Sequence, residues 1–258
     1  MILINQNEIQ DCYNFAEKAW QNRSQSVQQF GTSESRTRES FLADQISGKL
    51  AEIIFKKEIE KKYDSVKVHL DFNHYLDPLH TDNGDVTIED NGLTVPFRLD
   101  VKGSSHAAQW LLVEQHKFWD LETKKPMSDR YVMVKFSDEM PTSPELRADP
   151  ESILTLEQIS GKIVGWANHE DFISSEDNEP WFIFKKGDRL ISFQFLPKTA
   201  DYPKDIRHLR NYINKVRQSK QVENIYIGPK LDAELNIGMP IKWLNKDLNE
   251  LLNHSLVH

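Results

Sequence analysis

The chain has 258 residues, of which 38% are hydrophobic and 10% aromatic, and its formal net charge is −8. No run approaches the roughly 18 apolar residues of a membrane-spanning helix, and the negative charge argues against a protein that holds nucleic acid by bulk electrostatics alone. Cys12 is the only cysteine, which excludes an internal disulfide and a cysteine-cluster zinc site. The N-terminus lacks the features of a signal peptide, so we expect a cytoplasmic protein without membrane partners. No convincing linker divides the chain, and we expect one domain over residues 1–258.

The first predicted element is an amphipathic helix over residues 7–29. Its apolar side chains recur at helical spacing: Ile9, Tyr13, Ala16 and Trp20. A polar segment, residues 31–40, follows as a loop or arm. Arg36 and Arg38 in this segment are candidates for contacts with phosphate, and a solvated connector is the alternative.

Residues 39–62 form the next predicted helix, because apolar residues repeat along one stripe. The stripe consists of Leu42, Ile46, Leu50 and Ile53. Glu52 lies off this stripe, and Gly48, one turn earlier, is expected to let another backbone approach closely. Glu52 is then expected to point at the sheet, and an ordinary surface glutamate is the alternative.

The first predicted strand covers residues 65–72, and a loop follows it. This loop contains His74, Asp77 and His80, which invite a metal-site hypothesis. Histidines six residues apart in a loop match no tight ligand spacing, so we favour solvated loop residues there.

Residues 84–105 are the most informative stretch, because two runs of alternating apolar and polar residues are joined by Asn91-Gly92. This pattern predicts a β-hairpin with a tight primed turn. The apolar positions share one face: Val86, Ile88, Leu93, Val95, Phe97, Leu99 and Val101.

The turn also predicts the register of the hairpin, because paired positions should sum to 183. Asp85 then faces Arg98, and Val86 faces Phe97. Pro96 lacks a ladder donor and marks an edge or a bulge.

Asp85, Asp100 and Lys102 fall together on the polar face of this hairpin. Carboxylates are hard ligands that hold Mg²⁺ while leaving it several waters, and the metal lowers the pKa of a bound water. A neighbouring lysine can orient or help deprotonate that water. The pattern is therefore typical of metal-assisted phosphodiester hydrolysis.

Asp85, a hairpin turn and then Asp100-Val101-Lys102 resemble the PD-(D/E)XK nuclease superfamily, which includes the type II restriction endonucleases. A glutamate on a preceding helix often completes the set in that family, and Glu52 matches it. The residue before Asp85 is Gly84, where the family often has proline.

The resemblance implies an α/β fold, a restriction-endonuclease-like mixed β-sheet flanked by α-helices, with a catalytic core over about residues 39–137. It implies catalytic roles for Asp85, Asp100, Lys102 and Glu52, and a metal set of Asp85, Asp100, Glu52 and Val101. The implied cofactor is Mg²⁺, with Mn²⁺ as a substitute. The implied substrate is double-stranded DNA, cut to leave 5′-phosphate and 3′-hydroxyl ends, and a palindromic site would require a homodimer.

Polar residues after the hairpin are second candidates for DNA contact. Ser104 and Ser105 leave the Asp100-Val101-Lys102 strand where a scissile phosphate would lie, although a turn role is equally compatible. A strand begins at Trp110, and Gln115 and Lys117 are expected to close it.

The rest of the chain is predicted from shorter patterns. These predictions are a central strand at 129–136, a loop at 137–152, a strand at 162–167, a hairpin of 181–184 with 189–196, a strand near 224–227 and a helix at 245–254. An amphipathic helix over 203–220 carries the most concentrated basic face, and its Arg207 and Arg210 are candidates for tracking a phosphate backbone.

Three other functions fit parts of the pattern. A nuclease in repair, recombination or phage defence would recognise structure or modification instead of sequence. A nuclease-like fold could act only as a DNA-binding module, although all core positions carry competent residues. A small-molecule metallohydrolase built on His74, Asp77 and His80 fits the spacing poorly.

Overall fold

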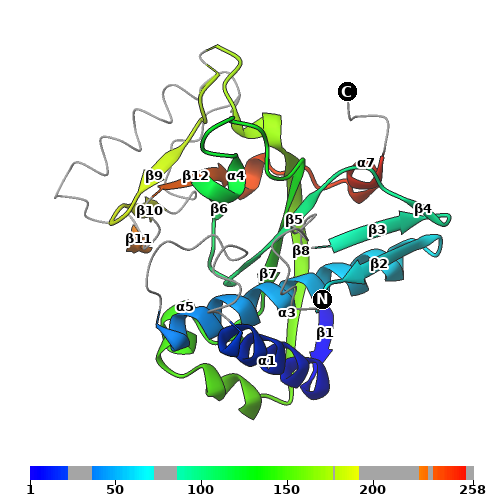
Figure 1. The fold of residues 1–258 in the computed structure, drawn as a ribbon, viewed down its shortest axis with the longest axis vertical. Coiled ribbons are helices and arrows are strands. Elements are labelled where there is room, and N and C mark those ends of the chain that lie inside the picture. Colours follow the sequence, from blue (N-terminus) through cyan, green and yellow to red (C-terminus); the bar gives the residue numbers. More distant parts are fainter. Residues whose placement is uncertain (23–36, 73–85, 177, 192–226, 232–234, 254–258) are drawn as a thin grey trace. The chain divides into compact units, whose positions relative to one another are not determined.

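The computed structural model describes residues 1–22, 37–72, 86–176, 178–191, 227–231 and 235–253 (Figure 1). It divides into two compact units: unit 1 comprises residues 1–108, 128–166 and 245–258, and unit 2 comprises residues 109–127 and 167–244. Each unit is discontinuous in sequence. The single-domain expectation for residues 1–258 stays a prediction.

Unit 1 is built on a mixed sheet of seven strands, which confirms the predicted α/β class. The strand order is β1 (Ile2–Asn5), β8 (Gln158–Asn168), β7 (Arg130–Phe136), β5 (Leu99–Ser104), β3 (Val86–Asp90) and β2 (Val66–Leu70), with β4 (Leu93–Thr94) paired to β3. β5 and β7 run parallel, whereas β3 pairs antiparallel with β2, β4 and β5. The predicted strands at 65–72 and 129–136 are confirmed, and β7 lies inside the sheet as expected.

The tight turn of the hairpin is confirmed. Asn91 and Gly92 have φ angles of 50° and 79°, the positive values that a type I′ turn requires. Asp90 pairs with Leu93 and Glu89 pairs with Thr94, which is the predicted register.

The register changes beyond the turn, so one predicted pair is wrong. Val86 pairs with Leu99 and not with Phe97. Pro96 has no amide hydrogen to donate, and the chain leaves the ladder around it. Two residues are inserted in total, so the alternation is preserved and Val95, Phe97 and Leu99 remain buried in the same core. Leu93 is the exception at 74% exposure. The predicted pairing of Asp85 lies outside the described residues.

One long helix, α3 (Arg38–Lys62), covers a face of the sheet, and α1 (Gln6–Gln21) packs on α3. α1 begins at a capping box of Asn5 and Glu8. The helix ends at Gln21, and Asn22 is its C-cap, so the helix does not continue through Asn22 as predicted. The rest of the predicted extension, residues 23–29, lies outside the described range. α3, capped by Thr37, confirms the helix predicted over 39–62 and contacts β1, β2, β5 and β7.

The close approach between helix and sheet occurs at Gly103, not at Gly48. A Cβ on Gly103 would lie 3.0 Å from the carbonyl oxygen of Ser47 and 3.2 Å from Cβ of Ala51. Around Gly48 there is open space within 4 Å. The expectation for Gly48 is therefore wrong, because the glycine that admits the neighbouring backbone belongs to β5.

The predicted loop at 137–152 contains a helix. α5 (Ser143–Ala148) starts at a capping box of Thr142 and Glu145, and a 3₁₀ helix, η1 (Pro150–Thr155), follows. The prolines and acidic residues that suggested a loop instead occupy helix starts, where they are favoured. The C-terminal helix is α7 (Leu248–Leu252), shorter than the predicted 245–254.

Unit 2 contains two small sheets. β6 (Trp110–Glu114), β12 (Leu235–Pro240) and β9 (Ile183–Lys185) form one, and β10 (Arg189–Ile191) pairs with β11 (Ile227–Lys230) in the other. In the described residues β9 pairs with β12 and β10 with β11, so the predicted hairpin of 181–184 with 189–196 is not formed there, and residues 192–196 lie outside the described part. The described part of the unit also has three short helices, α4 (Gln115–Phe118) and the 3₁₀ helices η2 (His169–Phe172) and η4 (Ile241–Trp243). His169 stacks on Phe118 at 4.1 Å.

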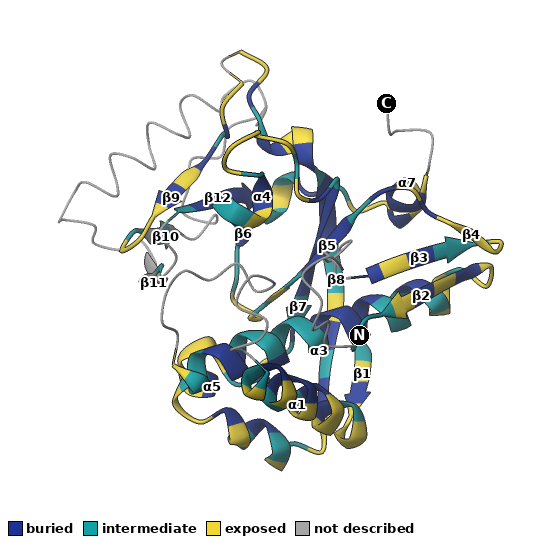
Figure 2. Ribbon diagram, viewed as in Figure 1, coloured by how far each residue is buried: buried dark blue, intermediate teal, exposed yellow. Residues whose placement is uncertain are grey.

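Burial follows the two faces of each element (Figure 2). In unit 1 the buried stripe of α3 packs on β2, β5 and β7, and α1 packs on α3 and β1, in one core. No helix within the described ranges is long and apolar enough to cross a membrane.

Candidate functional site

Asp100 and Lys102 are brought together on β5. Gly103 faces α3, so the alternation of the strand turns Asp100 and Lys102 to the opposite face of the sheet. Nζ of Lys102 lies 2.7 Å from Oδ2 of Asp100. The Asp100 residue is only 6% exposed, so the carboxylate and the ammonium form a partly desolvated ion pair.

Tyr131 lies beside this pair, because it is the register partner of Asp100 on the parallel strand β7. Burial and the charge of Asp100 both raise the pKa of Tyr131, so its phenol stays protonated at neutral pH. Tyr131 is therefore an uncharged side chain beside the site and does not change the net charge of the pair of Asp100 and Lys102.

Val101, between them, points into the core and is 3% exposed. Its side chain carries no ligand atom, so its main-chain carbonyl oxygen is the only group that it can offer to a metal. This restricts the predicted role of Val101 to its backbone.

Glu52 is buried on α3 at 4% exposure, so the alternative of an ordinary surface glutamate is wrong. Nζ of Lys49 lies 3.0 Å and 2.8 Å from its two carboxylate oxygens. The ammonium also lies 4.9 Å from the ring of Phe15 on α1. Ala51, the residue before Glu52, contacts β5. One residue turns the helix by about 100°, so the Glu52 side chain projects about 100° away from the direction of β5.

The pair of Lys49 and Glu52 has a further effect on α1. Burial, and then the charge of Glu52, raise the pKa of the Cys12 thiol, which therefore stays neutral and acts as an apolar core residue. The lone cysteine is not a nucleophile in this environment.

Replacing Lys49 with methionine is expected to lower the free energy of unfolding by about 2–3 kcal/mol, because it leaves a buried carboxylate without its cation. The measurement is urea unfolding of both proteins at pH 7. The double variant Lys49→Met, Glu52→Leu should recover most of the loss. If Lys49→Met unfolds at the wild-type midpoint, the buried pair has no energetic role.

The remaining predicted DNA contacts are dispersed. Ser104 is half-buried at the end of β5 and Ser105 is exposed after it. Gln115 and Lys117 lie in unit 2, where they form the short helix α4 and do not extend the preceding strand as predicted. Lys117 is exposed and Gln115 is half-buried.

Several predicted residues lie outside the described part of the chain. These are Asp85, Arg36, Arg207 and Arg210 among the site residues, and His74, Asp77 and His80 of the alternative metal site. Their roles stay predictions.

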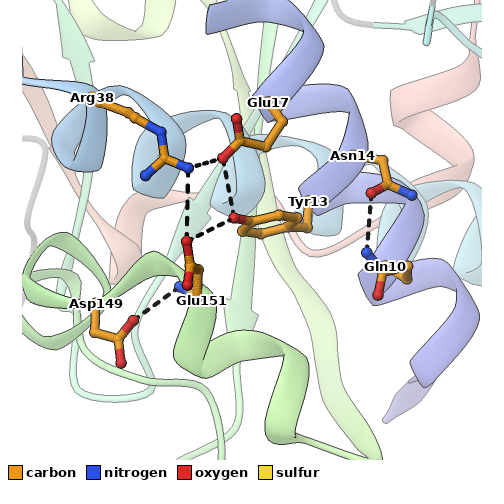
Figure 3. A network of polar contacts seen from close by, with 7 residues as sticks. All are labelled: Gln10, Tyr13, Asn14, Glu17, Arg38, Asp149 and Glu151. Atoms are coloured by element: carbon orange, nitrogen blue, oxygen red, sulfur yellow. Dashed lines mark hydrogen bonds and ion pairs between the residues drawn. The ribbon is translucent and has the colours of Figure 1, made fainter.

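Arg38 is described, and its guanidinium lies among carboxylates (Figure 3). It pairs with Glu17 and lies 3.7 Å from Oε1 of Glu151. The hydroxyl of Tyr13 lies 3.1 Å from Glu17 and 3.3 Å from Glu151. This network joins α1, α3 and η1, so the described contacts of Arg38 are structural and its predicted phosphate contact stays a prediction.

The network predicts a pH dependence of stability. Burial and the hydrogen bond to Glu17 raise the pKa of Tyr13 to about 12 from an ordinary value of about 10. Between pH 10 and 12 the unfolded chain releases this proton while the folded chain keeps it, so stability falls as pH rises. Urea midpoints at pH 9 and pH 11.5 should show a larger loss for wild type than for Tyr13→Phe. Equal losses would contradict the assignment.

Asp100 supplies the type of ligand that Mg²⁺ prefers, a carboxylate oxygen, and Mg²⁺ needs only one or two such groups beside its waters. The described residues, which exclude 73–85, contain no group of three or more His, Cys, Asp or Glu side chains that could hold a metal. The carboxylate of Asp100 therefore fits one position of a Mg²⁺ site.

Comparison of the chain with family models, curated proteins and solved structures finds no match. Sequence patterns did not predict that Lys49 and Tyr131 lie beside the site residues. Lys49 and Glu52 are three residues apart on a helix, a spacing that is a recognisable signal of an ion pair.

Proposed function

We propose that the protein is a Mg²⁺-dependent endodeoxyribonuclease that hydrolyses phosphodiester bonds of double-stranded DNA. The observation that supports this most is the partly desolvated pair of Asp100 and Lys102 on one face of a strand that follows a tight hairpin. A carboxylate ligand and a lysine on one short strand supply two groups that metal-assisted phosphodiester hydrolysis needs.

In this proposal Asp100 and Asp85 hold the metal together with the carbonyl of Val101. Glu52 lies on α3, which covers the face of β5 opposite Asp100, so the described geometry does not bring Glu52 into the same set. When bound, Mg²⁺ lowers the pKa of a water and offsets charge on the phosphate. Lys102, whose ammonium pairs with Asp100, orients the attacking water, and it takes up the proton of that water only after losing its own proton to solvent. The products carry 5′-phosphate and 3′-hydroxyl ends.

Within this class we propose a sequence-specific type II restriction endonuclease that acts in the cytoplasm. Cutting both strands of a palindromic site requires two copies of the active site, so we propose a homodimer. The size of the chain suits a catalytic core whose surrounding segments read the DNA.

The test is digestion of unmethylated plasmid and phage DNA by the purified protein, followed by analysis of the ends. Discrete fragments that religate without end repair support a site-specific enzyme of this chemistry. A smear or a nick with the same Mg²⁺ dependence favours a structure-directed nuclease. Binding without cleavage on a panel of unmethylated, methylated and branched DNAs would overturn the catalytic proposal in favour of a binding module.

A further inference from the structure

A pair of lysines, Lys135 and Lys162, lies on the sheet face that carries Asp100 and Lys102. Gly161 of β8 faces α3, since a Cβ there would lie 2.4 Å from Cδ1 of Ile54. Lys162 is the next residue and therefore projects from the opposite face, and it is exposed.

Lys135 of β7 joins Lys162 on this face. Ser104 and Lys135 are register partners on β5 and β7, so their side chains project to the same side. The amide of Ser137 donates to the carbonyl of Ser160 at 2.8 Å. Lys135 comes two residues before Ser137, and Lys162 comes two residues after Ser160. The two lysines therefore face each other across β7 and β8.

Two like charges opposed across a sheet destabilise each other. Burial, and then the charge of Lys162, lower the pKa of Lys135. Within the described ranges neither lysine has a carboxylate partner. The acidic residue at this edge, Glu139, accepts hydrogen bonds from the hydroxyls of Ser137 and Ser160 instead.

A pair of lysines beside a hydroxyl is the chemistry that binds a phosphate group. Lys135 lies one strand over from Lys102 and two residues further along, a Cα separation of roughly 8 Å from the standard strand spacings. A backbone phosphate bound at Lys135 would therefore be close to one held at Asp100 and Lys102.

We propose that Lys135 and Lys162, with the hydroxyl of Ser104, bind a phosphate of the DNA backbone next to the phosphate that is cleaved. This inference rests on the proposed function for the identity of the ligand. The lysine pair fixes the path of one DNA strand across β5, β7 and β8 and relieves its own repulsion when the phosphate binds.

The experiment compares wild type with Lys162→Gln and uses Lys67→Gln as the matched control. Lys67 is an exposed lysine on β2 of the same sheet. DNA binding is measured by fluorescence anisotropy in EDTA, so that cleavage cannot interfere, over a range of salt concentrations. Thermal stability is measured at low salt with and without pyrophosphate at matched ionic strength.

Lys162→Gln is expected to weaken DNA binding about 5-fold, the scale of one exposed ion pair, and to reduce the salt slope of binding by about 0.9. It should also raise the Tm in the absence of anions by about 1–3 °C, since repulsion from Lys135 is removed. A lysine with a merely structural role would lower the Tm. Lys67→Gln should leave DNA binding and its salt slope unchanged, and it should not raise the Tm, because Lys67 lies opposite Glu89 on β3.

The two proposals can fail separately. If wild type binds no DNA but pyrophosphate raises its Tm more than that of Lys162→Gln, the phosphate pair is retained and DNA is the wrong ligand. If Lys162→Gln binds DNA as tightly as Lys67→Gln does, or if wild type binds no DNA and pyrophosphate stabilises both proteins equally, the phosphate site is overturned.

Discussion

Replacing Lys102 with alanine is expected to slow Mg²⁺-dependent DNA cleavage by about 10²–10⁴-fold, the usual contribution of a positioned acid or base. The ammonium lies 2.7 Å from Asp100 and is the cation described next to that carboxylate. Without it the attacking water loses its orienting partner, and the buried carboxylate loses charge compensation. The measurement is the single-turnover rate at saturating enzyme, so that weaker DNA binding does not mimic a slower chemical step.

Two controls separate chemistry from folding in the Lys102 experiment. Lys102→Met keeps most of the side-chain volume, so its loss of rate should match that of Lys102→Ala while its urea midpoint stays nearer to that of wild type. Lys67→Ala removes an exposed lysine from another strand of the sheet and should cleave at the wild-type rate. Equal rates for Lys102→Ala and wild type would remove Lys102 from the reaction.

Replacing Arg130 with alanine is expected to cost about 4 kcal/mol of the free energy of unfolding. Arg130 is 1% exposed, and its guanidinium lies over the ring of Phe97 at 3.9 Å. It donates to the carbonyl oxygens of Leu251 and, at 3.0 Å, Asn253. One buried side chain therefore joins β7, the irregular segment after Pro96 and the C-terminal end of α7.

The loss at Arg130 has two parts that a second variant separates. Arg130→Met keeps much of the packing but removes the donors, so it should lose about half as much as Arg130→Ala. Arg147→Ala is the control, because its ion pair with Asp44 is about one-third exposed at both ends and should contribute less than about 1 kcal/mol. Urea unfolding of all three variants is the measurement. A loss at Arg130 no larger than that at Arg147 would contradict this role of Arg130 in joining the three segments.

Local patterns predicted the parts of unit 1 that carry the candidate site. The Asn91-Gly92 turn requires positive φ angles that few other sequences supply, and the alternation around it identifies the buried face. The register was predictable only as far as Pro96. A proline indicates that the ladder is broken but not how many residues are inserted.

Long-range packing decided what the sequence left open. Glu52 was predicted as a site residue mainly from the family resemblance. Its burial beside Lys49, whose ammonium lies over the ring of Phe15, depends on how α1 docks on α3. Arg130 was missed because charged residues are rarely buried, and its acceptors lie more than 120 residues away.

The strand pairing in unit 2 also could not be predicted from the sequence. β9 and β12 are short strands separated by about 50 residues, and nothing local specifies that they pair with each other. The predicted hairpin used the nearest strand as partner, which is the commonest arrangement but not the one formed.

The most direct test of a Mg²⁺-dependent nuclease site at β5 is cleavage of plasmid DNA by wild type and Asp100→Asn in Mg²⁺ and in EDTA. The substitution keeps the size of the side chain and removes the charge that would hold the metal. We expect wild type to cleave in Mg²⁺ alone, and Asp100→Asn to cleave in neither condition while it unfolds at a midpoint close to that of wild type. Cleavage by Asp100→Asn at the wild-type rate, or cleavage by wild type in EDTA, would contradict this account of the site.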